Sequence, residues 1–366
     1  MITLNDLKRE LEPIRPELNA AVTRVLDSGW FALGREVEAF EQEFSEFLGG
    51  GFLAGVGNGT DALELALRAL ELGAGDTVIT AANAGGYATT AILACGASPV
   101  YADVDPDDGL LDPAQLLALA RQSGARALII THLYGRMASM RALMEQARQA
   151  DLLVIEDCAQ AHGASMDGNP AGSWGDVGCF SFYPTKNLGA LGDGGAVYAR
   201  NRVLVERIHA LRQYGWTDKY ASSIPGGRNS RLDEIQAACL RARLPTLAMA
   251  NLRRRAIGRR YLEQIDNQWI TLPHRPDSPA DVFHLFPITC VERNALADHL
   301  AASDIQSAVH YPRPDYAQPA WRGRVPERKL PITDRRAGEI LSLPCHPALS
   351  EQEIDHVIDT CNRFQP

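Results

Sequence analysis

Lysine is scarce in this sequence. Lys8, Lys186, Lys219 and Lys329 are the only lysines among 36 basic residues, so the other 32 are arginines. Arginine stays protonated in proteins, whereas a lysine amine can lose its proton and act as a nucleophile. Lys186 is therefore either an amine that the chemistry of the protein requires or an ordinary solvated cation in a loop. It lies between aromatic residues and a string of glycines, in FSFYPTKNLGALGDGGAV from Phe180 to Val197.

Other absences narrow the class of protein. The seven cysteines are widely spread and include no CxxC pair, which predicts reduced thiols and no zinc or iron–sulfur site. No apolar run approaches the roughly 18 residues of a membrane span, and the N-terminal MITLNDLKRELEPIRPEL does not resemble a signal peptide. A net charge of -9 disfavours nucleic acid or an anionic membrane as a partner. We therefore expect a cytoplasmic protein without a metal site.

The organisation predicted from the sequence is α/β. Short β-rich runs alternate with helical patterns between about residues 53 and 200, namely DTVIT, SPVYADV, RALIITHL, DLLVIED and GGAVYA. This alternation predicts a mostly parallel sheet flanked by helices, with ligands bound beyond the carboxyl ends of the strands. A helical stretch interrupted at Pro245 separates a large domain, residues 1–245 with the N-terminal helices, from a smaller α+β domain, residues 246–366.

Two strand ends carry polar groups that could meet Lys186. In GNGTDALELALRAL, Thr60 and Asp61 open an amphipathic helix whose free amides could cradle a phosphate, although an ordinary helix cap needs the same residues. In LLVIEDCAQAHGA, a strongly apolar run ends in Glu156 and Asp157. A buried carboxylate is costly without a cation or a donor, so Asp157 should meet one; a structural ion pair would also satisfy it.

The third feature is the segment around the lysine. Ser181 offers a hydroxyl to an anion, and the glycines after Lys186 allow backbone to lie close to a ligand or form a bulge before a strand. A nucleophilic amine, a buried carboxylate and a phosphate cradle are together what pyridoxal 5'-phosphate requires. Each feature has a structural explanation by itself, and the combination favours this cofactor.

These residues also carry a family resemblance. The sequence resembles the DegT-type (DegT/DnrJ/StrS) sugar aminotransferases over nearly its whole length, in the motifs GNGTDALELAL, HLYG, IEDCAQAHGA, FSFYPTKNLGALGDGGAV, RNSRLDEIQAACLRARL and VHYPRP. The resemblance implies pyridoxal-phosphate fold type I and a homodimer with shared active sites.

The resemblance also implies roles for single residues. Lys186 is the catalytic residue, which bonds to the cofactor as an aldimine and moves the proton; Asp157 binds the pyridine nitrogen. The further cofactor-binding residues implied are Thr60, Asp61, Gln160, Ser181 and Asn229, of which Asn229 reaches the neighbouring subunit's site. His310 and Tyr311 are implied as substrate contacts.

Two positions depart from the family pattern. Relatives place an aromatic residue over the cofactor ring, whereas this sequence reads AANAGGYATT, with glycine at or near that position. Tyr87 is the nearest aromatic, and we assign it to the cofactor site. Many sugar-acting relatives have a histidine after YPxP, and here Tyr316 stands in its place. Such changes alter the shape of the substrate site more readily than the cofactor chemistry.

The function expected from the resemblance is transfer of an amino group from an amino acid, L-glutamate, to a keto group of a nucleotide-linked sugar, in amino-sugar biosynthesis. A cyclitol or another non-nucleotide ketone is an alternative acceptor. A non-catalytic regulatory protein with the same fold is a second alternative, disfavoured because such a protein has no need of a titratable amine at position 186.

Overall fold

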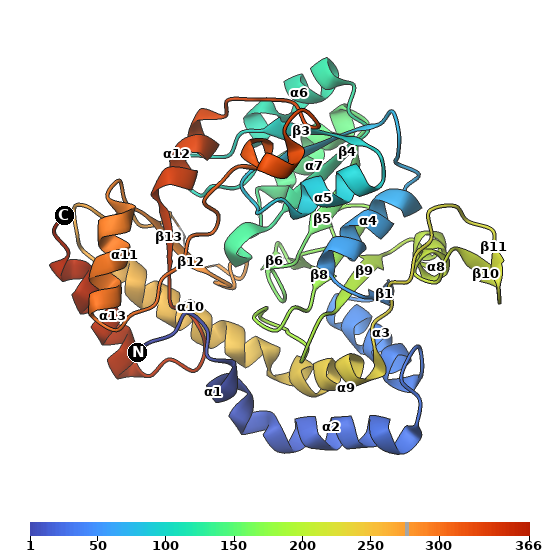
Figure 1. The fold of residues 1–366 in the computed structure, drawn as a ribbon, viewed down its shortest axis with the longest axis horizontal. Coiled ribbons are helices and arrows are strands. Elements are labelled where there is room, and N and C mark those ends of the chain that lie inside the picture. Colours follow the sequence, from blue (N-terminus) through green and yellow to red (C-terminus); the bar gives the residue numbers. More distant parts are fainter. Residues whose placement is uncertain (275–277) are drawn as a thin grey trace.

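A seven-stranded sheet forms the centre of the computed structural model, which describes residues 1–274 and 278–366 (Figure 1). In spatial order the strands are β1 (Phe52–Val56), β9 (Gly195–Ala199), β8 (Val177–Ser181), β5 (Leu153–Asp157), β4 (Ala127–Thr131), β2 (Thr77–Ala81) and β3 (Ser98–Ala102). Strand β9 runs antiparallel to both neighbours, and the other neighbouring strands are parallel. The predicted α/β class with a mostly parallel sheet is confirmed.

Helices cover both faces of this sheet (Figure 1). The helices of residues 1–264 are, along the chain, α1 (Leu7–Leu11), α2 (Arg15–Ser28), α3 (Arg35–Phe47), α4 (Gly59–Ala69), α5 (Tyr87–Ala94), α6 (Leu116–Ser123), α7 (Met140–Gln149), α8 (Arg202–Leu211), α9 (Glu234–Arg243) and α10 (Leu247–Gln264), of which α1, α2 and α10 lie away from the sheet. Between α9 and α10 the chain forms a short 3-10 turn, Leu244–Thr246, at Pro245. Proline has no backbone N–H and so interrupts the helical pattern there.

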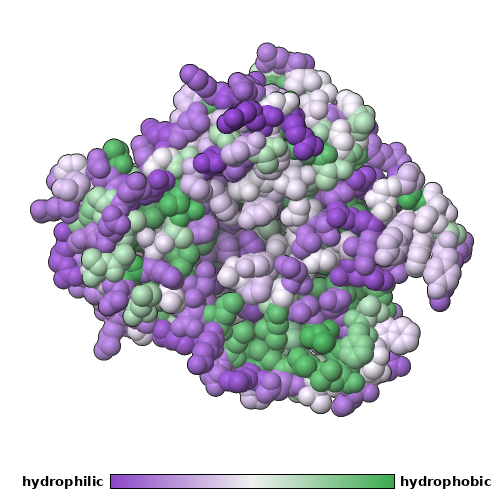
Figure 2. All heavy atoms as spheres, in the orientation of Figure 1, coloured by the Kyte–Doolittle hydropathy of each residue, from purple (hydrophilic) through white to green (hydrophobic). Residues whose placement is uncertain are grey.

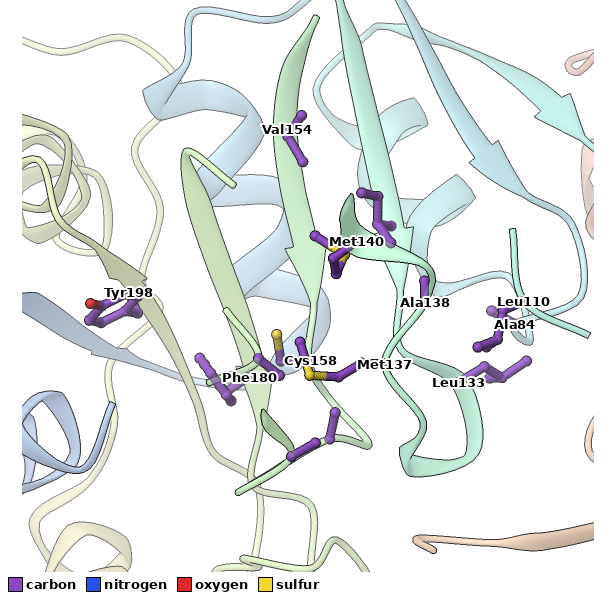
Figure 3. Close-up of a cluster of buried hydrophobic side chains, with 14 of the residues drawn as sticks. Ala84, Leu110, Leu133, Met137, Ala138, Met140, Val154, Cys158, Phe180 and Tyr198 are labelled. Carbon is purple, nitrogen blue, oxygen red and sulfur yellow. The ribbon is translucent and has the colours of Figure 1, made fainter. Parts of the chain in front are cut away.

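Alternating side chains along each strand divide the core into two layers. Ile155 and Val177 belong to a cluster with the apolar residues of α4, α5 and α8. Val154 and Phe180 belong to the cluster on the opposite face, part of which is drawn in Figure 3. Because successive side chains in a strand point to opposite faces, neighbouring residues such as Glu156 and Asp157 must enter different environments.

The C-terminal part has a core of its own. It contains the antiparallel pair β12 (Phe286–Thr289) and β13 (Ile340–Leu343), with α11 (Arg293–Ala302), α12 (Pro331–Glu339) and α13 (Glu351–Arg363). Ile2 joins this core and pairs with Ile305, while Arg9 donates to Glu353. Residues near Ile2 and Arg9 thus pack on the C-terminal part, whereas the helices α2 and α3 pack on α9 of the large domain. The boundary near residue 246 stays a proposal.

Two short two-stranded sheets complete the fold. Strands β6 (Ser165–Met166) and β7 (Asn169–Pro170) pair after β5, and β10 (Trp216–Asp218) pairs with β11 (Ala221–Ser222) in a hairpin that projects from the body (Figure 1). In the part of the chain that the structure describes, no helix is both long and apolar enough to span a bilayer.

Candidate active site

A cavity of about 450 Å³ lies at the carboxyl ends of three strands of the central sheet. Its lining comes from segments that follow β1, β5 and β8, and from the start of α5. Five of the residues selected from the sequence line it, namely Thr60, Tyr87, Asp157, Ser181 and Lys186. The topology brings them together because β1, β8 and β5 point the same way, so their carboxyl ends meet at one edge.

The start of α4 forms one wall of the cavity. Asn58 caps the helix, and its Oδ1 accepts a hydrogen bond from the Asp61 amide at 2.8 Å. Gly59 is needed there, because a β-carbon at this position would lie 2.6 Å from Ser181 Cβ. The helix start therefore sits directly against Ser181, and the unpaired amides of a first helical turn favour an anion.

Asp61 has a different setting from the one expected of a phosphate ligand. Its amide is used by Asn58, and its carboxylate accepts from Ser230 Oγ at 2.6 Å and lies 3.3 Å from Arg228. Asp61 does not line the cavity.

The loop that carries Lys186 is anchored by the next residue. Asn187 donates from Nδ2 to Asn251 Oδ1 at 2.8 Å and to the Val282 carbonyl at 3.1 Å. Its Oδ1 pairs with His284 Nδ1 at 3.0 Å. Burial lowers the pKa of His284 well below its usual value, so the imidazole is neutral and donates from Nδ1. These contacts tie the lysine loop to α10 and to the segment before β12.

Lys186 and Asp157 influence each other across the cavity. Burial lowers the pKa of the Lys186 ammonium from 10.5 to about 8, and the charge of Asp157 opposes this shift. Burial also raises the pKa of Asp157, while hydrogen bonding from the Ala159 amide and the charge of Lys186 lower it. Because burial is the larger cause for both groups, each is less stable in its charged form than it would be in water.

The remaining residues selected from the sequence are not part of the cavity lining. The Tyr134 amide donates to Gln160 Oε1 at 2.6 Å, and Gln160 Nε2 lies 3.4 Å from the Tyr311 hydroxyl. His310 Nδ1 pairs with Ser342 Oγ at 2.9 Å, and burial, followed by the charge of Lys186, lowers its pKa to about 4. Asn229 is exposed and does not line the cavity of its own chain.

The glycines at the departure from the family pattern make room for side chains from the C-terminal part. Gly85 and Gly86 have φ angles of 81° and 84°, a region that favours glycine. A β-carbon on Gly85 would lie 2.9 Å from Tyr311 Cε1, and one on Gly86 would lie 2.4 Å from Trp321 Cη2. Tyr87 is the aromatic residue of this segment that lines the cavity.

Sequence reasoning missed some residues of the lining, among them Asn58, Tyr183 and Asp193. Asn58 could have been found as a capping residue before a helix. Asp193 is a charge inside a glycine string, and Tyr183 is an aromatic residue three positions before the lysine; both are signals that a ligand site could produce.

Comparisons with known proteins agree with this geometry. The model of the DegT/DnrJ/EryC1/StrS aminotransferase family matches residues 12–362. The chain is 42% identical over 364 residues to the dTDP-3-amino-3,6-dideoxy-α-D-galactopyranose transaminase of Aneurinibacillus thermoaerophilus, with 100% of this chain and 99% of the relative covered.

Solved structures resemble the whole chain as well. The crystal structure of S. venezuelae DesV in complex with a ketimine intermediate has a TM-score of 0.94 and 42% identity, covering 99% of this chain and 97% of that chain. The structure of NtdA from Bacillus subtilis with bound cofactor PMP has a TM-score of 0.90 and 29% identity, covering 97% and 83% respectively.

Proposed function

The chain belongs to the DegT/DnrJ/EryC1/StrS aminotransferase family, and we propose that, as a sugar aminotransferase of this family, it aminates a keto group of a nucleotide-linked sugar. One observation carries the chemistry: a partly buried amine, Lys186, and a buried carboxylate, Asp157, share a cavity with the start of α4. The acceptor class is supported by the relative that shares 42% identity and is named as a dTDP-amino-sugar transaminase.

The family implies pyridoxal phosphate, and the cavity fits this cofactor. Gly59 keeps a gap beside Ser181 that a β-carbon would fill, and Asp157 is a buried acid suited to a cationic ring nitrogen. We propose that Thr60 and Ser181 hold the phosphate, that Asp157 pairs with the pyridine nitrogen and that Tyr87 lies against the ring. Gln160 reaches the ring hydroxyl. When bound, the cofactor supplies an electron sink for the carbon that loses its proton.

Lys186 acts in this proposal as both nucleophile and proton carrier. A pKa of about 8 leaves part of the amine neutral near pH 7, so it can attack a carbonyl carbon and can accept a proton. The anchoring of Asn187 by Asn251, Val282 and His284 limits where the amine can move. With the cofactor bound, Lys186 would take the proton from the α-carbon of the donor and pass it to the cofactor carbon that receives the amino group.

Asp157 performs an electrostatic role. Among the residues that the structure describes, its carboxylate accepts hydrogen bonds only from the Ala159 amide at 3.1 Å and from Thr131 Oγ1 at 3.4 Å, which is little for a buried charge. A protonated ring nitrogen would complete its pairing and would bring its pKa back down. Asp157 therefore keeps that nitrogen protonated while negative charge develops on the substrate.

The amino donor proposed is L-glutamate, in a two-step exchange in the cytoplasm. Bound pyridoxal phosphate would carry the amino group between the donor and the sugar. The product is an amino sugar for a polysaccharide, a glycoconjugate or a secondary metabolite. His310 and Tyr311, beside the Gln160 and Tyr134 contacts, are proposed to face the substrate.

We also propose a homodimer with shared active sites. Apolar residues gather at the lower edge of the molecule in Figure 2, over the region of α2, α3 and α9 in Figure 1. Leu26, Trp30 and Phe31 there are 58%, 61% and 51% exposed, which is unusual for a surface that stays in water. Asn229 is exposed and free to enter a partner's phosphate site, as the resemblance implies.

A half-reaction assay tests the proposed function. The purified holoenzyme is mixed with L-glutamate, and the absorption spectrum of the bound cofactor is followed. We expect L-glutamate to convert the bound cofactor to its amine form. Addition of a dTDP- or UDP-linked keto sugar should then restore the original spectrum, and addition of a keto-inositol should not. Reversal by keto-inositols alone would replace the acceptor class, and a spectrum that responds to no amino donor would refute the transaminase assignment for this chain.

Subunit mixing tests the shared site. The variants Lys186→Ala and Asn229→Ala are purified separately and then mixed under conditions that exchange subunits. If each site needs Asn229 from its partner, a mixed dimer contains one intact site and activity returns. Verified mixed dimers without activity would contradict this arrangement.

A further inference from the structure

The segment from His310 to Trp321 is held on the large domain by a buried carboxylate. It includes the 3-10 turns Asp315–Ala317 and Pro319–Trp321. Asp315 is only 1% exposed; Thr89 Oγ1 donates to its Oδ2 at 2.5 Å, and its amide donates to the Ala82 carbonyl at 2.8 Å. The Tyr101 hydroxyl lies 3.1 Å from Thr89 Oγ1 and completes the chain of hydrogen bonds.

This attachment lies beside Gly85 and Gly86. Asp315 binds the first turn of α5, directly after Gly85 and Gly86, on which the rings of Tyr311 and Trp321 rest. The ring of Tyr311 meets that of Tyr87 edge to face, with centroids 6.2 Å apart and an angle of 78°. Tyr87 in turn lines the cavity of Lys186. The segment His310–Trp321 thus packs against Tyr87, a residue of the cavity lining.

We propose that Asp315 is a positioning residue for the sugar acceptor: by fixing His310–Trp321 on the Gly85–Gly86 turn through Thr89, it holds Tyr311 against Tyr87 and shapes the acceptor side of the cavity. The inference rests on the proposed function. An amino-acid donor is small and reacts beside Lys186, whereas a nucleotide-linked sugar extends well beyond it and needs the outer wall for binding. Loss of the attachment should therefore affect the acceptor more than the donor.

The chain offers a matched control. Thr333 donates from Oγ1 to Asp103 Oδ1 at 2.8 Å, and both threonines are fully buried. This second threonine–aspartate pair also joins the C-terminal part to the large domain, at the start of α12, but it does not involve the Gly85–Gly86 turn. Thr89→Val and Thr333→Val therefore each remove one threonine hydroxyl that bonds to an aspartate. Only Thr89 holds the segment that contacts Tyr87.

The experiment measures the two half-reactions separately. L-Glutamate serves as the donor, and a dTDP-linked 3-amino sugar, run in reverse, reports the acceptor side. For Thr89→Val and Asp315→Ala we expect kcat/KM for the sugar to fall about tenfold, the effect of a disturbed buried hydrogen bond, with the glutamate rate changed less than about twofold. Asp315→Asn keeps an oxygen that accepts from Thr89 and should restore most of the loss. Thr333→Val should leave both half-reactions unchanged.

Hydrogen exchange in the cofactor-free protein gives a readout independent of turnover. We expect faster exchange in peptides covering residues 310–322 for Thr89→Val and Asp315→Ala, and no change there for Thr333→Val. Unchanged exchange, equal losses in both half-reactions, or equal losses for the two threonine variants would each overturn the role of Asp315. A wild-type protein that reacts with no donor would instead refute the proposed function, while the exchange data would still decide whether the attachment exists.

Discussion

Glu156 and Asp157 are neighbouring acids on β5, yet they lie in opposite environments. Glu156 is fully buried and accepts four hydrogen bonds, from His132 Nε2 at 2.9 Å and from the amides of Gly172, Trp174 and Gly175 at 2.7–2.9 Å. Asp157 is 5% exposed and accepts two weaker ones, from Ala159 and Thr131. The sheet's alternation places the first acid in a closed network and the second beside Lys186.

The number of hydrogen bonds that each carboxylate accepts distinguishes an acid with a structural role from an acid that is available to a ligand. The His132 ring is fixed on both sides, because its Nδ1 accepts from the Ala138 amide at 3.2 Å while its Nε2 serves Glu156. Glu156 thus fastens the loop at residues 172–175 to β5 and has no capacity left for a ligand. A buried carboxylate with spare capacity, such as Asp157, is expected where a cationic group binds.

The largest effect should follow from removing the amine that faces Asp157. Lys186→Ala eliminates both the nucleophile and the proton carrier, so we expect the donor half-reaction to slow by roughly 10⁴-fold or more. Single-turnover absorption measurements with L-glutamate check this. Lys186→Arg serves as the control, because it keeps the charge but cannot lose its proton; activity in either variant would contradict the role of Lys186.

A smaller kinetic loss should distinguish the two acids. Asp157→Asn removes the charge with little change of shape, so we expect the donor half-reaction to slow by about a hundredfold. Unfolding of the cofactor-free variant should need no less denaturant than wild type, because an incompletely paired buried charge has been removed. Urea titration and stopped-flow absorption give the two values, and a loss of stability without a loss of rate would reverse the assignment.

The opposite pattern is expected on the other face of β5. Glu156→Gln places an NH2 group, which is a hydrogen-bond donor, among the four donors that Glu156 now accepts from. We therefore expect the free energy of unfolding to fall by about 2–4 kcal/mol, with the rate of the half-reaction with the amino-acid donor changed only a few-fold. Calorimetry and urea titration of the cofactor-free protein measure the first effect. If Glu156→Gln and Asp157→Asn behave alike in both measurements, the contrast between the two acids is wrong.

The smallest expected effect is a shift in the pH dependence of Lys186 in the cofactor-free protein. Its pKa of about 8 means that acylation of the amine should rise with pH and level off above that value. Because the Asp157 charge raises this pKa, Asp157→Asn should move the midpoint to lower pH. Peptide mass spectrometry after a short pulse of reagent measures it, and the exposed Lys8, Lys219 and Lys329 serve as internal references.

Much of the site could be predicted because its residues follow strands in recognisable motifs. Asp157 and Ser181 end β5 and β8, and Thr60 and Lys186 follow β1 and β8 by a few residues. Parallel strands bring such positions to one edge of the sheet. The strands β1 and β8 themselves were not singled out, since FLAGV and VGCFS are short runs that contain glycine and lack a clear alternation.

Contacts between distant segments could not be predicted in the same way. Nothing local to AANAGGYATT indicates that Tyr311 and Trp321 will occupy the space above Gly85 and Gly86, or that Thr89 will hold Asp315. The missing aromatic residue was visible from the sequence, but its explanation depends on the packing of a segment more than 200 positions away. Hydrogen bonds such as those of Asn187 likewise depend on where α10 and β12 come to lie.

The contact between Gly86 and Trp321 also restricts how this protein can be altered. A β-carbon at position 86 would lie 2.4 Å from the indole, so position 86 cannot accept a larger residue while Trp321 is in place. Engineers who wish to introduce the ring-covering aromatic residue of relatives would have to shorten position 321 in the same step.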